Sequence, residues 1–316
     1  MRTVSVPKTE GLPPDLERRA RGAYLGLAVG DALGATVEFM TPNEIRLRHG
    51  VHDQLLGGGW LRLRRGQVTD DTEMSLALGD CILRQQGRVD AHGVALAFSD
   101  WMREKPVDIG HTVRRGIVHY RHTGEPRVPY DDQGAGNGAA MRCLPVALAT
   151  LASPADVVRR GALDQARTTH HNALSDVATV VLVELVQAAL RGASRDELCG
   201  AVDRFVTANP EFGFRARRPV QNPSGYIVDT LRAVFQAFAT QSSFETALVD
   251  VVNRGGDADT TGAILGMLAG ALYGVDSIPL RWLQRLDPGV AQRVSRQSVA
   301  LLRSTPMVRD GGAASG

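Results

Sequence analysis

Two short acidic segments contain the residues best suited to chemistry. The first reads Thr-Asp-Asp-Thr over residues 69–72, and the second reads Gly-Asp-Ala-Asp-Thr over residues 256–260. Together they supply four carboxylates and flanking threonine hydroxyls, which are hard oxygen ligands of the kind that Mg²⁺, Mn²⁺ or Ca²⁺ prefers over Zn²⁺. Four carboxylates gathered without a cation would repel one another and raise each other's pKa. The pattern therefore favours a divalent-metal site, and a dinuclear site would relieve the repulsion.

Each acidic segment also has a simpler interpretation, because both stand at the predicted start of a helix. Asp70 could be an N-cap with Glu73 at N3, a capping-box arrangement, and Asp257 or Asp259 could cap the second helix. Capping does not require two adjacent carboxylates between two threonines. The two interpretations are compatible in part, since the dipole at a helix N-terminus favours negative charge.

Three further segments carry candidate functional groups. Residues 30–39 place an acid near each end of a predicted helix exit. Residues 134–142 form a glycine-rich loop, whose backbone N–H groups could hold a phosphate, although many such loops bind nothing. The histidines of residues 170–171 are as often structural as functional. Tyr226 could stack on a base, with core packing as the alternative.

The elements that must position these groups are helices. Of the 316 residues only 5% are aromatic, and Ala, Gly and Leu are abundant, which favours close-packed helices over a β-sandwich. Apolar residues recur at helical spacing over residues 16–33, 72–84, 91–102, 139–152, 154–167, 175–191, 195–208, 226–239, 244–253, 261–273 and 288–302. We therefore predict an all-α protein of about a dozen helices, with a single compact domain over residues 16–305. Residues 1–15 are predicted to be a flexible arm and residues 306–316 a flexible tail.

Two stripes of glycine predict how two of these helices pack. Glycine recurs every four residues in both, at Gly22, Gly26, Gly30 and Gly34 and again at Gly262, Gly266, Gly270 and Gly274. Each glycine inside a helix costs about 1 kcal/mol relative to alanine, so a stripe of four needs a compensating gain. Close approach of two helix backbones is such a gain. The stripes predict two tightly packed central helices whose acidic ends, Asp31 and Glu38 on one and Asp257 and Asp259 on the other, converge.

Bulk properties limit the partners and the compartment. A formal net charge of +2 gives no indication of nucleic acid or of an anionic membrane as partner. The three cysteines are widely spaced without a Cys-x-x-Cys pair, which fits a reduced, cytoplasmic protein. The N-terminus shows no apolar signal core. The most apolar stretch, residues 177–190, is short for a membrane span and is predicted to be a buried helix. We expect a monomer that does not insert directly into a membrane.

Four segments, taken in order, resemble the ADP-ribosylglycohydrolase family. They are residues 22–34, 69–72, 136–142 and 255–262, and the resemblance extends over residues 20–290. It implies an all-α fold with a dinuclear centre of Mn²⁺ or Mg²⁺, which removes ADP-ribose from a modified side chain. The cleavage would pass through an oxocarbenium-like state, as in other glycoside chemistry.

The resemblance also implies roles for individual residues. The implied metal ligands are Thr69, Asp70, Asp71, Asp257, Asp259 and Thr260. Glu38 and Asp108 would lie near the scissile ribose, where either could serve as the base. The implied substrate contacts are Gly110, His111, the diphosphate loop of Gly136, Asn137 and Gly138, and His170 and Tyr226 at the adenosine end. The sequence departs from the family pattern at His111, where asparagine is usual, and over residues 170–173, where His-Asn-His-Pro is usual.

Residues 57–63, 103–110 and 226–230 resemble most closely those family members that act on the iron protein of nitrogenase. This implies an ADP-ribosylated arginine of that protein as substrate. It also implies regulation by a PII-type signalling protein, with recruitment to the inner membrane through that partner. Two alternatives stay open. The chain could act on another linkage, such as serine or nucleic acid, or it could be a non-catalytic ADP-ribose-binding relative, against which the intact ligand set argues.

Overall fold

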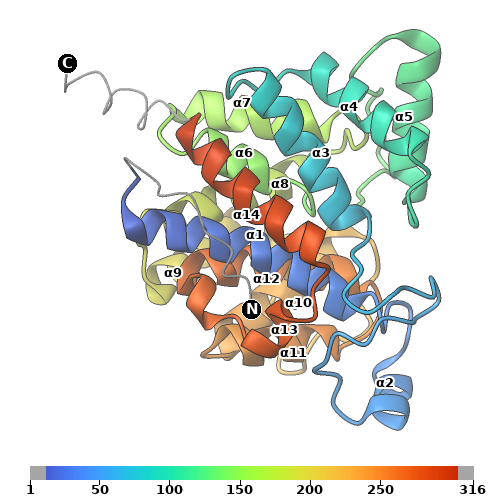
Figure 1. Cartoon of the computed structure of the whole chain (residues 1–316), viewed down its shortest axis with the longest axis vertical. Coiled ribbons are helices and arrows are strands. Elements are labelled where there is room, and N and C mark those ends of the chain that lie inside the picture. The colour runs from blue at the N-terminus through green and yellow to red at the C-terminus, as the bar shows by residue number, and fades with distance from the viewer. Residues whose placement is uncertain (1–11, 305–316) are drawn as a thin grey trace.

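The computed structural model describes residues 12–304, and there the chain forms 14 α-helices. Helices α1 (Pro14–Gly34) and α12 (Ala258–Tyr273) cross the middle of the molecule (Figure 1). The other helices are α2 (Pro42–His49), α3 (Asp70–Arg84), α4 (Ala91–Arg103), α5 (His111–Thr123), α6 (Leu144–Ala149), α7 (Ala155–Ala166), α8 (Ala173–Leu190), α9 (Arg195–Ala208), α10 (Ile227–Thr240), α11 (Phe244–Val252), α13 (Leu280–Leu283) and α14 (Pro288–Arg303). Over residues 12–304 β-structure is limited to isolated bridges, so the all-α prediction is confirmed.

The predicted flexible ends lie mostly outside the described residues. Residues 1–11 and the whole predicted tail, 306–316, are not described. At residues 12–15 the chain already belongs to the fold, because Leu12 is buried and α1 begins at Pro14 rather than Leu16. Proline suits the first helical position, where its missing N–H group costs no hydrogen bond.

The two glycine stripes lie against each other, as predicted. A Cβ added at Gly26 would stand 2.2 Å from the carbonyl oxygen of Gly266, and one at Gly30 would stand 2.1 Å from that of Gly262. No real Cβ tolerates such distances, so only glycine lets the two backbones touch. The pairing is antiparallel, because Gly34 at the end of α1 meets Ala258 at the start of α12. The exit of α1 and the entry of α12 are thereby fixed side by side.

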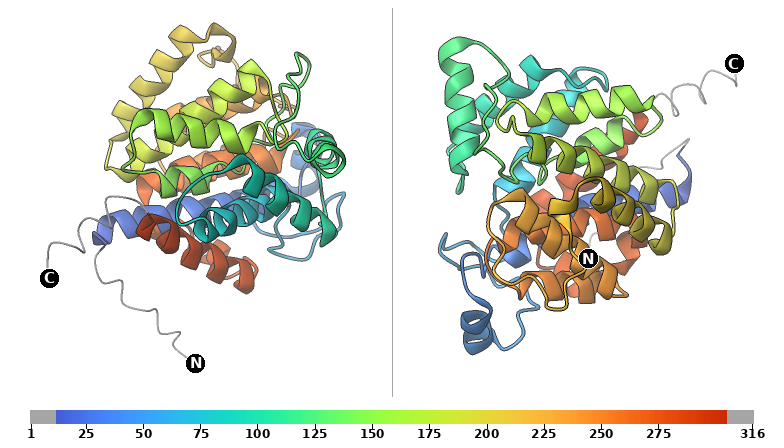
Figure 2. Two further views of the ribbon diagram at one scale, coloured as in Figure 1. Left: turned by 90° about the horizontal axis from the view of Figure 1, so that it is seen from above. Right: turned by 180° about the vertical axis from the view of Figure 1, so that it is seen from behind.

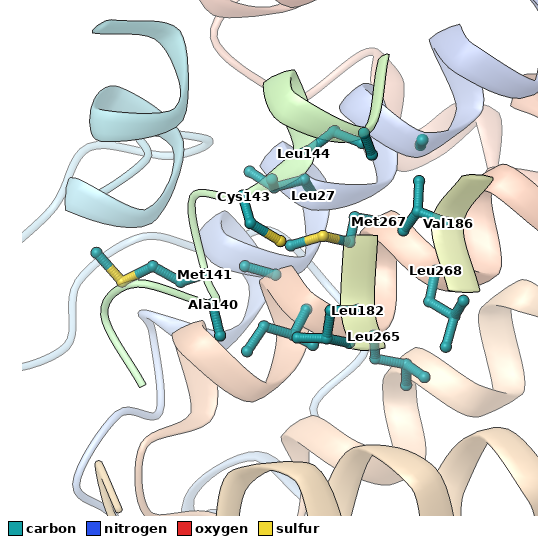
Figure 3. Close-up of a cluster of buried hydrophobic side chains, with 14 of the residues drawn as sticks. Leu27, Ala140, Met141, Cys143, Leu144, Leu182, Val186, Leu265, Met267 and Leu268 are labelled. Carbon is teal, nitrogen blue, oxygen red and sulfur yellow. The ribbon is translucent and has the colours of Figure 1, made fainter. Parts of the chain in front are cut away.

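The apolar core surrounds this central pair. Figure 3 shows Leu27 of α1 and Met267 of α12 meeting Leu182 of α8 and Leu144 of α6. All four side chains are buried. In Figure 1 and in the right-hand view of Figure 2, α2 stands out from the body of the molecule, together with the loop that follows it.

Helix α8 is apolar enough and, at 18 residues, long enough to cross a membrane by length and composition alone. It begins at Ala173, earlier than the apolar stretch predicted from the sequence. Its surroundings are those of a core helix, because 72% of it is buried inside the protein.

Candidate functional site

The first acidic segment is held in place by Asp31 of α1. The carboxylate of Asp31 accepts hydrogen bonds from the N–H groups of Thr69 and Thr72, at 3.0 and 3.1 Å, and from both threonine hydroxyls. These bonds satisfy the free N–H groups at the start of α3 from another helix. Asp70 and Asp71 in the first turn are therefore not needed as caps, and their carboxylates are left for another purpose.

The capping-box alternative for this segment is wrong. The N-cap of α3 is Thr69, which makes no side-chain cap of its own. Glu73 does not reach back to the N-cap but accepts a hydrogen bond from the indole of Trp101 at 2.9 Å.

Two glycines with positive φ, Gly255 and Gly256, fix the direction of the chain that leads into the second acidic segment. Gly256 has φ 67°, and a Cβ there would stand 2.1 Å from the carbonyl oxygen of Pro223. Its N–H donates to Met40 O at 3.0 Å, and its carbonyl accepts from Phe39 N at 2.7 Å. The chain entering α12 is thus bonded directly to the residues that follow Glu38.

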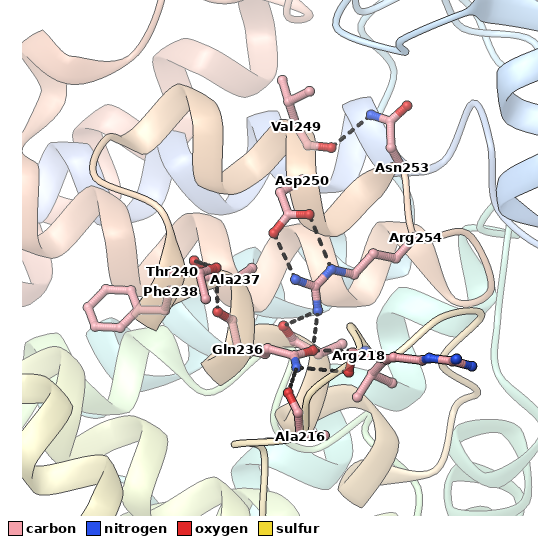
Figure 4. A network of polar contacts seen from close by, with 12 residues as sticks. Ala216, Arg218, Gln236, Ala237, Phe238, Thr240, Val249, Asp250, Asn253 and Arg254 are labelled. Atoms are coloured by element: carbon pink, nitrogen blue, oxygen red, sulfur yellow. Dashed lines mark hydrogen bonds and ion pairs between the residues drawn. The ribbon is translucent and has the colours of Figure 1, made fainter.

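A buried arginine fixes the same loop from its other side (Figure 4). Arg254 donates to Asp250 Oδ2 at 2.7 Å and to Gln236 Oε1 at 2.9 Å. Gln236 in turn donates to the carbonyl oxygen of Arg218 at 3.2 Å and accepts from Val220 N at 2.8 Å. The network therefore joins α10, α11 and the loop that precedes Tyr226. Its central residue, Arg254, stands three residues before Asp257.

Glu38 lies just beyond α1, where the chain turns sharply. The next residue, Phe39, has φ 61°, a conformation that side-chain-bearing residues seldom adopt. The indole N–H of Trp60 donates to Glu38 Oε2 at 2.6 Å, and the rings of Trp60 and Phe39 lie 5.5 Å apart. Trp60 thus orients one oxygen of Glu38 and leaves Oε1 open.

The carboxylates predicted from separate parts of the sequence converge. One oxygen each from Glu38, Asp108 and Asp259 lie within 4.8 Å of one another, close enough to hold a cation between them. Asp71 lies alongside, since its Oδ2 is 3.5 Å from the hydroxyl of Thr260. Asp70 Oδ2 accepts a hydrogen bond from Gly110 N at 3.3 Å. The predicted convergence of helix ends is confirmed, with Asp70, Asp71 and Asp259 in the first turns of α3 and α12.

These carboxyl groups are hard to ionise in the protein alone. Burial, followed by repulsion from Asp108, raises the pKa of Asp70 to about 8. Burial raises the pKa of Glu38 to about 8 as well, with Asp257 and Asp108 adding to the effect and the Trp60 hydrogen bond opposing it. The pKa values of Asp71 and Asp259 lie well above the ordinary range for the same two reasons. A cation would remove the repulsion and repay part of the desolvation cost.

The donor set fits a hard divalent cation. The Oδ1 atom of Asp71 is buried and has no hydrogen-bond partner within residues 12–304. A buried carboxylate oxygen without a partner is costly, and a metal ion is a physical remedy. All the surrounding ligand atoms are oxygens, which suits Mg²⁺ or Mn²⁺ better than Zn²⁺.

A cleft of about 400 Å³ opens from the carboxylates. Its walls contain most of the residues predicted as site residues, namely Glu38, Asp70, Asp108, Gly110, His111, Gly136, Asn137, Gly138, His170, Asp257, Asp259 and Thr260. Thr69 and Asp71 are buried and do not line it. A larger groove of about 930 Å³ between α3 and α4 contains none of the predicted site residues.

The glycine-rich loop forms one wall of the cleft, but most of its polar groups are already engaged. The N–H of Gly136 donates to Gly134 O at 2.8 Å, and that of Asn137 donates to Gly225 O at 3.0 Å. The amide side chain of Asn137 donates to Asp257 Oδ2 at 2.7 Å. Within residues 12–304 the N–H of Gly138 makes no backbone hydrogen bond, which leaves it available to a ligand.

The remaining predicted contacts lie around the cleft. His170 is buried beneath the loop, where its ring would meet a Cβ at Gly136 or Gly138 within 3.0 Å. Tyr226 does not line the cleft and is 42% exposed, so core packing is excluded for it, and its backbone pairs with Gly136. His111 is exposed at the first position of α5.

Sequence reasoning missed the residues that hold the site rather than form it. Asp31, Trp60 and Arg254 all contact site residues or the loops that carry them. Asp31 was expected at the converging helix ends but not as the residue that holds Thr69 and Thr72, and no positioning role was expected for Trp60 or Arg254. Asp31 and Trp60 each stand within a segment that carries the family resemblance, which was the available signal.

The fold and the site together define a class. The sequence pattern of the ADP-ribosylglycohydrolase family matches residues 12–309, and the chain belongs to that family. Among curated relatives, the ADP-ribosyl-[dinitrogen reductase] glycohydrolase of Rhodospirillum rubrum is 50% identical over 289 residues, which are 92% of this chain and 97% of the relative. The ADP-ribosylarginine hydrolase Tri1 of Pseudomonas putida is 33% identical over 92% of this chain and 79% of its own length.

A solved structure agrees with these relatives. It is described as an ADP-ribosylglycohydrolase-related protein complex, with a TM-score of 0.82 and 37% sequence identity. The match covers 92% of this chain and 99% of the solved one. The relatives therefore share the whole helical domain rather than a part of it.

Proposed function

We propose that this chain hydrolyses the bond between ADP-ribose and a modified arginine side chain. The observation that carries the proposal is the buried carboxylate cluster at the head of a cleft, in a chain half identical to a named ADP-ribosyl glycohydrolase. Two relatives whose names specify a dinitrogen reductase or an arginine as the modified target support this choice of linkage.

The chain's own residues suggest how the reaction is assisted. Trp60 occupies Oε2 of Glu38, so Oε1 is the oxygen left to accept a proton from the attacking water. Asp108 lines the cleft and receives the N–H of Ile109 on Oδ1 at 2.7 Å, while its Oδ2 accepts no hydrogen bond from the described residues. A carboxylate with a raised pKa is a competent base near neutral pH. A protonated guanidinium leaves as neutral guanidine, so no dedicated acid is required.

We propose two divalent cations, Mn²⁺ or Mg²⁺, as cofactors. Thr69, Asp70, Asp71, Asp257, Asp259 and Thr260 would hold them. When bound, such ions supply Lewis-acid polarisation of substrate oxygens and of water. The orphaned Oδ1 of Asp71 supports their presence.

The ligand assignment is tested with Asp257→Ala and Asp259→Ala. Both variants should lose ADP-ribose release from an arginine-modified peptide and lose bound metal, while circular dichroism shows an intact fold. Asp132→Ala is the control, because Asp132 is exposed and does not line the cleft. Full activity in both aspartate variants would contradict the proposal.

We propose the iron protein of nitrogenase as the target. ADP-ribosylated iron protein should be reactivated in the presence of Mn²⁺ and not in the presence of a chelator. Parallel assays on arginine-modified and serine-modified peptides decide the linkage. Release from serine alone would replace this proposal with the alternative linkage.

Regulation by a PII-type protein, recruitment to the inner membrane through it and a monomeric state are part of the same proposal. The name of the Rhodospirillum rubrum relative supports the choice of target, whereas the regulation, the recruitment and the monomeric state rest on the family resemblance of the sequence alone. Light scattering of the pure chain should give a mass near 33.9 kDa. Addition of a PII protein should yield a complex whose mass differs from that of a dimer of this chain.

A further inference from the structure

A buried arginine lies beneath the glycine-rich loop without a carboxylate partner in the described part of the chain. Arg142 is fully buried, and its guanidinium donates to Gln165 Oε1 at 3.0 Å, to Gln165 O at 3.0 Å and to Thr169 Oγ1 at 2.8 Å. Its charge also stacks on the ring of Phe98, 4.3 Å away. An arginine can only donate hydrogen bonds, so Thr169 must accept from it.

This bond decides the direction of the next one. Thr169 Oγ1 also lies 2.8 Å from Nδ1 of His170, and it makes no other side-chain hydrogen bond within residues 12–304. If Nδ1 carried the hydrogen, the threonine proton would be left without an acceptor at a buried site. Leaving a buried donor unpaired costs about 1–3 kcal/mol. The threonine hydroxyl therefore donates to Nδ1, and the ring hydrogen stands on Nε2.

The other ring nitrogen faces the ligand cleft. His170 is one of the residues that line the cleft. Its Nε2 would stand 2.9 Å from a Cβ placed on Gly136, so it lies against the loop, and it has no protein hydrogen-bond partner among the described residues. Burial lowers the pKa of His170 to about 3, so the ring is neutral at physiological pH.

We infer that Arg142 and Thr169 are positioning residues that hold His170 in its Nε2–H form, so that the cleft offers a fixed hydrogen-bond donor to an oxygen of the bound ligand. The donor keeps its direction because both residues behind it are buried. The identity of the acceptor as an oxygen of an ADP-ribosyl group rests on the proposed function, whereas the tautomer does not.

The tautomer can be read without any substrate. In full-length protein labelled with ¹⁵N-histidine, the ring nitrogen shifts and couplings distinguish Nε2–H from Nδ1–H, and His170→Gln assigns the signal. We expect the Nε2–H form in the unmodified chain at pH 6 to 8. Observation of the Nδ1–H form would overturn the inference.

Substitution of Thr169 tests the relay. Thr169→Val keeps the shape and removes the hydroxyl, so His170 should lose its single tautomer. The KM for ADP-ribosylarginine should rise about tenfold with kcat nearly unchanged, which is the loss of one ordinary hydrogen bond, about 1.4 kcal/mol. Thr169→Ser should restore both the tautomer and the KM, which a packing defect would not allow.

Thr168→Val is the matched control. Thr168 is as buried as Thr169, and its hydroxyl also accepts a long hydrogen bond from Arg142, at 3.4 Å, but it donates to Gln165 O at 2.8 Å and does not touch His170. This variant should keep the tautomer and the KM. A Thr169→Val variant that also keeps both would overturn the inference. An Nε2–H tautomer in a chain that releases no ADP-ribose would instead count against the proposed function alone.

Discussion

At the scale of single residues, Trp60 at the surface of the cleft holds Glu38, which belongs to the buried carboxylate cluster. The indole N–H lies 2.6 Å from a buried carboxylate oxygen, while 53% of the Trp60 side chain is exposed. A hydrogen bond to the charged form of a carboxyl group favours ionisation. It therefore opposes the effect of burial on the pKa of Glu38.

Replacing Trp60 with phenylalanine should shift the activity to higher pH. The variant loses the N–H donor, so the pKa of Glu38 rises by about one unit, the equivalent of one hydrogen bond to a charged group. The acid limb of the kcat profile should move upward accordingly. Trp101→Phe is the control, because Trp101 donates in the same way to Glu73 outside the cleft. A profile that does not move in Trp60→Phe would contradict a role of Glu38 as the base.

Some residues of the candidate site could be predicted from the sequence and others could not. Asp70, Asp71, Asp257 and Asp259 could be singled out because two acids close together at a helix start exceed what capping requires. The position of Asp31 at a converging helix end was predicted, but its hydrogen bonds to Thr69 and Thr72 were not, and neither was the contact of Trp60 with Glu38. These partners stand 38 and 22 residues away, and neither separation leaves a local pattern. Asn137 was expected to contact a ligand, but its side chain is bonded to Asp257.

At the scale of elements, backbone contact between α1 and α12 carries the geometry of the site. The contact is possible only because glycine removes every side chain from the seam. The apolar pattern predicted these two helices well, since both are buried along nearly their whole length.

Gly30→Ala tests how far this seam is required. Its new methyl group would stand 2.1 Å from the carbonyl oxygen of Gly262, and relief of that overlap must separate the two helices. We expect a loss of about 1–3 kcal/mol in the free energy of unfolding, measured by urea denaturation, together with weaker Mn²⁺ binding. Gly200→Ala is the control, because its methyl group on α9 would meet only the flexible end of Arg204, at 3.6 Å. Equal stability of the two variants would be evidence against the seam.

Helices with few buried residues escaped prediction. Helix α5 buries only Val113, Gly116 and Ile117, and α2 buries only Ile45, so neither shows a continuous apolar face. The helix expected over residues 139–152 is confined to Leu144–Ala149. Its first half is replaced by turns in the wall of the cleft, where Ala140 N and Met141 N both donate to Asn137 O. Because these turns are buried, their residues are apolar, and the sequence pattern there resembles that of a helix.

At the scale of the whole molecule, the protein carries several buried acids that resist ionisation. The pKa of Glu38 and of Asp70 is about 8 in the folded chain, whereas an unfolded chain ionises such groups near pH 4. Between these values the folded state binds more protons than the unfolded state. The free energy of unfolding of the metal-free protein therefore falls as the pH rises toward 8 and beyond.

Calorimetry at pH 6 and pH 8.5 in a chelator should show the lower Tm at pH 8.5. Added Mn²⁺ should raise the Tm more at pH 8.5 than at pH 6, because cations bind the ionised carboxylates. The double variant Glu38→Gln with Asp70→Asn should lose much of the pH dependence. A metal-free Tm that is the same at both pH values in the unmodified chain would contradict the prediction.

The glycine seam has a consequence for how the chain finds its alignment. Because glycine repeats every four residues on both helices, a slip of α12 by one repeat along α1 would still set glycine opposite glycine at two or more positions of the seam. Such a slip would move the two acidic ends apart by about 6 Å. The oxygens of Glu38 and Asp259, now within 4.8 Å, could then no longer share a cation. A cation bound between these carboxylates would therefore stabilise only one of the alignments that the seam permits, and would select it over the slipped ones.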